Sequence, residues 1–253
     1  MKTASRLGLS AALLCGALAG ACGGSQQEAP PPAPIVTNPV DPATAGSIRG
    51  TIALQGTPPA PEPINMESDP YCQQQGAATT ETVTVGTGGA LQNVFVYVKD
   101  GLGDRVFPVP TTPVVLDQKG CRYTPHVLGI QVGQPFEITS SDSTLHNVHA
   151  MPESNREFNK AHQMAGIRHS HVFTTKEVMV PFKCDVHRWM NAYVGVLDHP
   201  YFAVTGADGS FELTGLPPGT YTIEAWHEKL GTRTQTVTIG EKQTSDVSFS
   251  FTV

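Results

Sequence analysis

Short segments in which apolar and polar residues alternate follow one another along the chain from residue 47 to the end. Val, Thr, Phe and Tyr are frequent in them, and clusters of Gly, Pro or Asp separate one from the next. A period of two residues predicts β-strands, and no long stretch keeps the period of an α-helix. We therefore expect an all-β fold built from sandwiches. The predicted strands span Ser47–Ala53, Glu81–Val85, Asn93–Val98, Pro113–Asp117, Val127–Val132, Pro135–Ser140, Val172–Thr175, Glu177–Cys184, Ala192–Leu197, Phe202–Thr205, Gly209–Leu213, Thr220–Trp226, Thr234–Ile239 and Ser245–Val253.

One segment, Pro152–Ser170, is polar and irregular, and we predict a long loop there. The 253 residues include 25 Gly and 21 Pro, and only 15% are charged, against roughly 25% in an average soluble domain. This composition is typical of a turn-rich β protein. The net charge of −6 argues against a nucleic-acid partner, because such a binder needs a basic face for the phosphates.

The first residues have the features of a targeting segment. Lys2 and Arg6 precede a short apolar run, Leu7–Gly20, which suits a secretory signal peptide and is too short to span a bilayer. The sequence Ala-Gly-Ala-Cys that ends at Cys22 resembles the lipobox of bacterial lipoproteins, although it also fits an ordinary cleavage site. The resemblance implies a signal peptide over residues 1–21 and a lipid on Cys22 that anchors the protein to a membrane. We therefore expect an exported periplasmic or cell-envelope lipoprotein, located at the outer membrane.

Residues 22–46 are rich in Pro and polar residues and predict an extended linker rather than part of a core.

Three donors of soft or borderline character lie within seven residues near the end of a predicted strand. They are the thiol of Cys184, the imidazole of His187 and the thioether of Met190. A second histidine, His146, follows the predicted strand Pro135–Ser140. One thiolate, two imidazoles and a weak thioether are the ligands of a mononuclear copper site that transfers electrons. The residues therefore predict one bound copper ion.

The two ligand segments, His146-Asn147-Val148 and Cys184-x-x-His187-x-x-Met190, resemble the type 1 (blue) copper site of the cupredoxins. The ligand spacing is most similar to that of the amicyanin- and plastocyanin-like members. The resemblance implies a cupredoxin Greek-key β-sandwich over residues 105–198, with His146, Cys184, His187 and Met190 as the copper ligands. It also implies that Asn147 ties the two ligand segments together.

Two further roles come from the same resemblance. Asp185 stands where relatives often have Ser or Thr beside the copper-binding cysteine, and we expect it to join the hydrogen bonds around the ligands. In cupredoxins the loop histidine reaches the surface where partners dock. The resemblance therefore implies that His187 is the electron port and that Trp189 anchors the partner beside it.

The remaining cysteines can be assigned by elimination once Cys184 binds copper. Cys15 leaves with the signal peptide and Cys22 takes the lipid, so Cys72 and Cys121 remain in an exported, oxidising setting. A disulfide between them is the simplest expectation, and two free buried thiols are the alternative.

A second resemblance lies near the C-terminus. The Asp208-Gly209 turn and the later Pro217-Pro218-Gly219 turn, with the strands around them, resemble the carboxypeptidase regulatory-like (transthyretin-like) β-sandwich. Two earlier strands, at residues 50–56 and 93–98, fit the N-terminal half of that family. We therefore expect a second small sandwich made from residues 47–104 and 199–253, with the cupredoxin domain between them.

The expected function is an exported carrier that passes single electrons through the copper between redox partners. The negative charge favours a basic partner such as a c-type cytochrome. We do not expect an enzyme, because multicopper catalysis needs several paired histidine motifs and the chain has one, at residues 169–171.

Two alternatives stay open at this point. The first is a surface module that binds carbohydrate or protein and carries only structural copper. The second is copper binding and delivery, with further donors in and beside the predicted loop: Met151, His162, Met164, His169 and His171.

Overall fold

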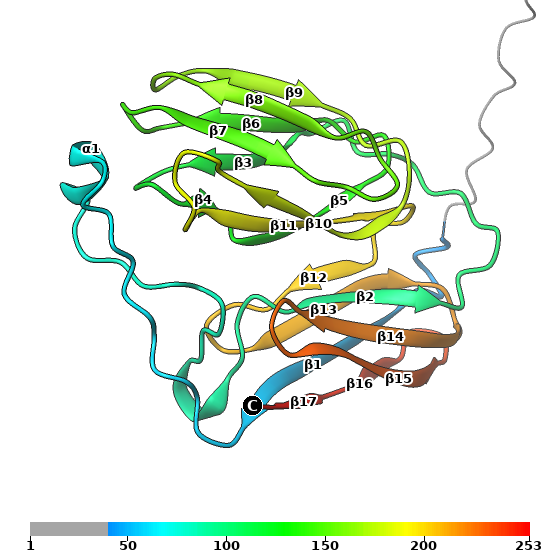
Figure 1. The fold of residues 1–253 in the computed structure, drawn as a ribbon. Coiled ribbons are helices and arrows are strands. Elements are labelled where there is room, and N and C mark those ends of the chain that lie inside the picture. Colours follow the sequence, from blue (N-terminus) through cyan, green and yellow to red (C-terminus); the bar gives the residue numbers. More distant parts are fainter. Residues whose placement is uncertain (1–39) are drawn as a thin grey trace, which may run out of the picture. The chain divides into compact units, whose positions relative to one another are not determined.

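The computed structural model describes residues 40–253, so the expected signal peptide, the lipid-bearing Cys22 and most of the linker lie outside the described residues. In the described part, the predicted all-β class is confirmed (Figure 1). Strands account for nearly all of its regular structure, beside one short helix, α1 (Pro70–Gln73), and one 3₁₀ turn, η1 (Thr87–Gly89). No helix in residues 40–253 has the length and apolar character of a membrane span.

The first sandwich contains the predicted ligand segments. One sheet has the strand order β5-β11-β10-β7-β8, and the other has the order β4-β3-β6-β9. Their inner faces share a core in which Leu116, Ile138, Val148 and Val194 are completely buried. The strands are β3 (Val114–Gln118), β4 (Tyr123–Thr124), β5 (Val127–Gln131), β6 (Phe136–Ser140), β7 (His146–Ala150), β8 (Phe158–His162), β9 (Arg168–His171), β10 (Glu177–Lys183) and β11 (Asn191–Leu197).

The second sandwich is built from strands that precede the first sandwich in the chain and strands that follow it. One sheet has the order β13-β1-β16, with β17 also paired to β1, and the other has the order β12-β2-β14-β15. Ile48, Val96, Ile223 and Phe251 are buried between the two sheets. The strands are β1 (Gly46–Gln55), β2 (Phe95–Asp100), β12 (Phe202–Val204), β13 (Ser210–Leu216), β14 (Gly219–His227), β15 (Gly231–Ile239), β16 (Thr244–Asp246) and β17 (Phe249–Thr252).

The prediction of a loop over Pro152–Ser170 was wrong in part, because this segment contains β8 and most of β9. These strands lie at the edges of the two sheets of the first sandwich, and the middle of β8 is exposed. An edge strand needs only backbone pairing, here with β7 from His146↔His162 to Ala150↔Phe158, so its side chains need not alternate. Conversely, the predicted strands Glu81–Val85 and Val172–Thr175 are not strands.

Phe95 of β2 packs closely against two glycines of the first sandwich. A Cβ atom at Gly195 would lie 2.4 Å from the Phe95 ring, and one at Gly129 would lie 2.3 Å from the Phe202 ring. Glycine is therefore required at both positions, because the rings occupy the space that any side chain would need.

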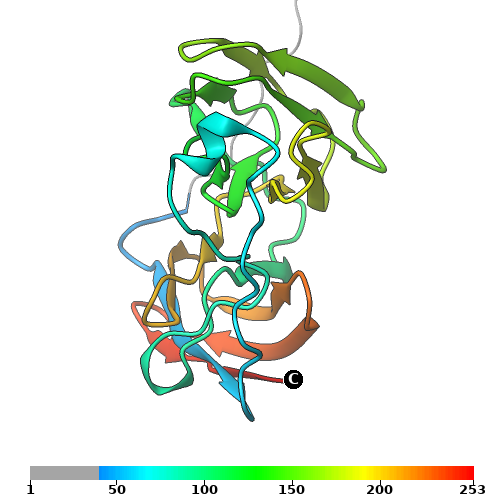
Figure 2. The same ribbon diagram turned by 60° about the vertical axis from the view of Figure 1, so that its left-hand side comes forward.

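A long connection between β1 and β2 carries α1 and contacts the first sandwich. Residues 63–79 of this connection, which we call the cap, are closed at their base by the bridge Pro63↔Thr79 and the 2.9 Å hydrogen bond from Ile64 N to Ala78 O. The disulfide Cys72–Cys121 joins α1 to the turn between β3 and β4. Figure 2 shows α1, in cyan, beside the first sandwich. The pairing of these two cysteines is the one expected from the sequence.

Candidate metal centre

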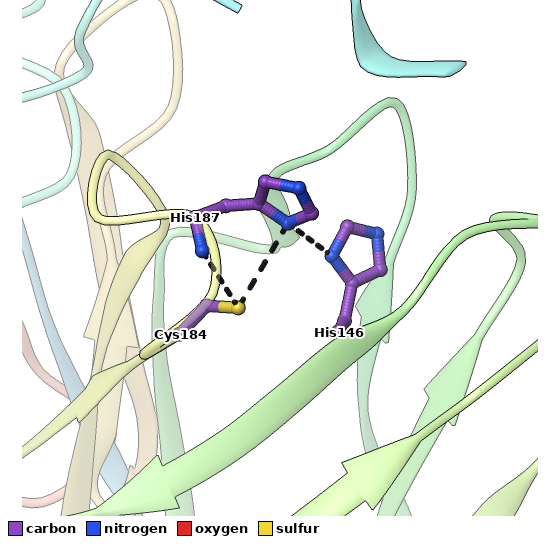
Figure 3. A group of neighbouring side chains, drawn as sticks. All are labelled: His146, Cys184 and His187. Carbon is purple, nitrogen blue, oxygen red and sulfur yellow. Dashed lines mark hydrogen bonds between the residues drawn. The ribbon is translucent and has the colours of Figure 1, made fainter. Parts of the chain in front are cut away.

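Three predicted ligands come from two places in one sheet of the first sandwich. His146 is the first residue of β7, Cys184 follows β10 directly, and His187 lies in the loop before β11 (Figure 3). The loop is tight, because Met190 N donates to His187 O at 2.9 Å and Cys184 N donates to Met190 O at 3.1 Å. It therefore brings a sulfur and a ring nitrogen from the same loop next to β7.

The donor atoms of these three residues converge. The Nδ1 atoms of His146 and His187 are 2.9 Å apart, and Cys184 Sγ is 4.0 Å from His187 Nδ1. All three donors lie within 4.8 Å of one another. The side chains are buried, with exposures of 0% for His146, 1% for Cys184 and 2% for His187. The arrangement is compact enough for one metal ion to contact all three.

The outer nitrogen of each ring faces a carboxylate. His146 Nε2 is 3.0 Å from Asp142 Oδ2, and His187 Nε2 is 3.1 Å from Asp69 Oδ2. A carboxylate accepts, so each Nε2 donates its hydrogen, and in the neutral rings both Nδ1 atoms carry lone pairs. These lone pairs point toward each other and toward the sulfur, an arrangement that favours a cation between them. The donor set therefore fits copper, which prefers thiolate and imidazole ligands.

The electrostatics of the site favour an ionised thiol. Burial raises the pKa of Cys184, but hydrogen bonds from His146 and His187 lower it to about 6. Burial lowers the pKa of His146, but Asp142 and Cys184 raise it to about 9. Without metal, the site therefore holds a thiolate beside a protonated imidazole at neutral pH. A metal ion would replace that proton, since ligands bind in their deprotonated forms.

Asn147 connects the two ligand segments. Its Oδ1 atom accepts from Asp185 N at 2.7 Å and lies 3.3 Å from Cys184 Sγ, and its Nδ2 atom donates to Asp185 Oδ2 at 3.0 Å. Burial raises the pKa of Asp185, but hydrogen bonds from Asn159, Lys183 and Asn147 lower it to about 2. The carboxylate is thus ionised and forms part of the hydrogen-bond network around the cysteine.

Met190, the fourth predicted ligand, is 1% exposed and belongs to the same buried cluster as Cys184. Its backbone closes the ligand loop, as described above. The structure therefore buries Met190 in the same core cluster as Cys184, and its role as a ligand stays a prediction.

Three residues that support the site were not identified from the sequence. Tyr123 Oη donates to Asn147 O and Lys183 O, which joins β7 to β10 next to the ligands. Asp142 stands four residues before His146, so its position could have suggested a contact. Asp69 lies 118 residues from His187 in the chain, and nothing in the sequence marks it.

The sequence predicted that His187 reaches the surface, but in the structure its side chain is buried. The ring is buried because the cap covers its outer edge, with Asp69 at 3.1 Å and Cys72 Sγ at 3.7 Å from Nε2. Trp189 is half-buried, and its ring centroid lies 4.9 Å from that of His187. Trp189 also lines a hollow of about 210 Å³. Of the two residues expected at the electron port, only Trp189 borders accessible space.

The additional donors considered for copper delivery lie outside the three-donor group. His162 and His169 contact each other, with ring centroids 4.8 Å apart, and His169 and His171 line a cavity of about 500 Å³ near β8 and β9. Met164 is 61% exposed. In residues 40–253, no group of three or more possible metal ligands includes these histidines.

Comparisons with known proteins give one family match over part of the chain and several partial matches to solved structures. The family model of the carboxypeptidase regulatory-like domain matches residues 190–252, from β11 to β17. No curated protein matches the chain.

Three of the similar solved structures illustrate how partial these matches are. The Cu-containing nitrite reductase NirK from Thermus scotoductus SA-01 is 21% identical, with 39% of this chain and 25% of that chain covered and a TM-score of 0.33. A purple cupredoxin from Nitrosopumilus maritimus is 24% identical, with 33% and 98% covered and a TM-score of 0.29. A reduced mutant of amicyanin is 19% identical, with 40% and 97% covered and a TM-score of 0.31. This chain thus spans a quarter of the length of the nitrite reductase.

Proposed function

We propose that this protein is an exported copper protein that transfers single electrons through a mononuclear type 1 copper site. The observation that carries the proposal is the inward orientation of both imidazoles: the Nδ1 atoms of His146 and His187 face each other beside Cys184, while their Nε2 atoms are held by carboxylates. Met190 is the fourth residue that we propose would hold the copper. Copper held by these donors would supply one-electron chemistry by alternating between Cu(I) and Cu(II).

The protein contributes a rigid and dry environment for that chemistry. Asn147 holds the cysteine loop against β7, and the backbone of Met190 closes the same loop. Because the donors are buried and held by hydrogen bonds, the protein would shield a bound copper ion from solvent and limit the movement of its ligands when charge is gained or lost. Buried donors also favour electron transfer over copper delivery, since delivery needs an exchangeable, open site.

We propose that electrons leave through Trp189. The cap covers the outer edge of His187, whereas the Trp189 ring contacts His187 and borders the surface hollow that Arg122 and Arg188 also line. Trp189 Nε1 donates to Cys121 O at 2.9 Å, which holds the ring in this position. A redox partner could therefore approach within contact of Trp189 without touching the metal ligand.

A copper titration of the purified protein tests the function. One equivalent of Cu(II) should produce the intense visible absorption of a thiolate bound to copper, and a reversible one-electron couple should follow. Cys184→Ser should remove the absorption, whereas His169→Ala, a histidine outside the donor group, should keep it. A colourless protein that releases copper readily to a chelator would contradict the proposal and support copper delivery.

The location is proposed from the sequence. We propose a cell-envelope lipoprotein anchored through Cys22, with a c-type cytochrome as one possible redox partner class. Incorporation of labelled fatty acid into the wild-type protein, and its absence in Cys22→Ala, would test the anchor.

A further inference from the structure

Asp69 and Asp142 are two carboxylates that reach the candidate copper site from different parts of the chain. Asp69 belongs to the cap, where it begins α1, and Asp142 lies in the turn between β6 and β7. Each uses its Oδ2 atom to accept from the Nε2 atom of one histidine of the donor group. Both outer ring nitrogens are therefore occupied by an anionic acceptor.

Asp69 is held firmly by groups other than the histidine. Its Oδ1 atom accepts from the backbone N–H groups of Tyr71 and Cys72, at 2.8 and 3.1 Å, and its Oδ2 atom accepts from Thr144 Oγ1 at 2.7 Å. Burial raises its pKa, but these hydrogen bonds and that of His187 lower it to about 2. Four donors thus fix the carboxylate in position.

Asp142, the carboxylate that faces His146, is likewise held by groups other than its histidine. Gly120 N and Cys121 N each donate to it at 2.8 Å, in addition to His146. Burial raises its pKa, but the hydrogen bonds from His146 and from these two backbone groups lower it. This carboxylate is also charged, and 2% of it is exposed.

The two aspartates and the disulfide form one closed chain of contacts. Asp69 binds the backbone N–H of Cys72, Asp142 binds that of Cys121, and the disulfide joins these two cysteines. The loop of contacts closes through the two imidazoles, whose Nδ1 atoms are 2.9 Å apart. Because every link is fixed, neither carboxylate can turn away from its histidine without disturbing the next link.

We infer that Asp69 and Asp142 are positioning residues that keep both Nδ1 lone pairs directed at the metal and lower its reduction potential. The inference rests on the proposed function. An N–H group that donates to a carboxylate makes its ring a stronger electron donor, which favours Cu(II) over Cu(I). A lower potential follows, because the oxidised form is stabilised more than the reduced form.

The decisive variant is Asp69→Asn, which removes the carboxylate charge but keeps the shape of the side chain. Because Asp69 lies in the cap and not in the sandwich core, the variant should still fold. We expect it to weaken Zn(II) binding about tenfold. We also expect it to raise the reduction potential of the copper protein, by 59 mV for each tenfold loss of Cu(II) relative to Cu(I) binding. Asp69→Glu should restore part of both properties.

Two further variants separate positioning from general stability. Thr144→Val removes the hydroxyl that holds Asp69 and should shift the potential in the same direction by less. Asp117→Asn is the control: Asp117 is also half-buried, and its carboxylate accepts from Thr139 Oγ1 and Ser141 Oγ rather than from a histidine. Its potential and Zn(II) affinity should equal those of the wild type.

A third readout is independent of copper colour. In the metal-free protein, ¹⁵N NMR should show hydrogen on Nε2 of His187 in the wild type and loss of that preference in Asp69→Asn. Unchanged potential, Zn(II) affinity and ring hydrogen position in Asp69→Asn, or equal changes in Asp117→Asn, would overturn the inference. If the wild type forms no blue copper site, the proposed function fails, while Zn(II) affinity and NMR still decide the role of Asp69.

Discussion

The Nδ1 atoms of His146 and His187 lie 2.9 Å apart while both Nε2 atoms donate to carboxylates, so a pair of neutral rings has no hydrogen to place between the two Nδ1 atoms. Two lone pairs directed at each other are unfavourable unless a proton or a metal ion lies between them. Without metal, the proton of the His146 imidazolium fills this position, and a metal ion bound by both Nδ1 atoms would replace it.

Metal binding should consequently stabilise the fold. Zn(II) at 100 times its dissociation constant should raise the free energy of unfolding by about 2.7 kcal/mol, and a chelator should remove the gain. Urea unfolding with Zn(II) and with chelator measures this difference. In Cys184→Ser this increase in the free energy of unfolding should be much smaller. An equal increase in that variant would show that the metal binds at another site.

Replacement of Trp189 should slow electron exchange without removing the copper site. Trp189→Leu takes away the ring that contacts His187 and borders the surface hollow. Stopped-flow oxidation of the reduced protein by a small metal complex should be severalfold slower, with unchanged blue absorption. The other tryptophan of the chain, Trp226, packs against Tyr193 instead, so Trp226→Leu is the matched control. Equal oxidation rates in the wild type and Trp189→Leu would show that electrons leave by a route other than Trp189.

Loss of the disulfide should destabilise the fold and open the cap. Cys72 and Cys121 are 49 residues apart, and a bridge over such a loop contributes about 2–4 kcal/mol to the free energy of unfolding. The double variant Cys72→Ala/Cys121→Ala should lose about this amount and should release Zn(II) to a chelator faster, because Asp69 is no longer held over His187. A thiol reductant should lower the free energy of unfolding of the wild type and speed its Zn(II) release in the same way. It should change neither property of the double variant.

The second sandwich should lose stability in mild acid. His199 accepts from Tyr201 N at Nδ1 and donates from Nε2 to Val98 O, and His227 likewise accepts two backbone N–H groups at Nδ1. Protonation at Nδ1 would break the hydrogen bonds that these Nδ1 atoms accept, and burial lowers the pKa of each histidine to about 4.

The direction follows from proton binding. An unfolded histidine has a pKa of about 6.5, so between pH 6.5 and 4 the unfolded chain binds more protons than the native one. Stability is therefore complete above pH 6.5 and falls as the pH decreases toward 4, by up to about 1.4 kcal/mol per pH unit for each histidine. Urea unfolding across this range measures the slope, which His199→Gln should reduce. A slope that is the same in His199→Gln would contradict this role.

The close contact of Phe95 with Gly195 gives a packing prediction. Gly195→Ala places a methyl group 2.4 Å from the ring and should lower the free energy of unfolding by about 1–3 kcal/mol. Gly206→Ala is a control, because its nearest neighbour lies 4.0 Å away and its backbone does not need glycine. Thermal unfolding of the two variants should separate them clearly.

The sequence by itself was sufficient for the fold class and for the local part of the site. Alternating segments indicated the central strands, since these bury one face, and the spacing of Cys184, His187 and Met190 placed three donors in one loop. The edge strands β8 and β9 escaped detection because their residues do not alternate between apolar and polar, and the backbone pairing with β7 and β6 leaves no mark in the sequence.

Only the tertiary structure decided how the site is closed. Asp69 reaches His187 across 118 residues, because the disulfide and the cap packing bring α1 over the ligand loop. No local pattern encodes such a contact: it depends on where a separate segment packs, and it removes His187 from the surface that its loop position predicted. Chain spacing determined the donors, and long-range packing determined their orientation and their access to solvent.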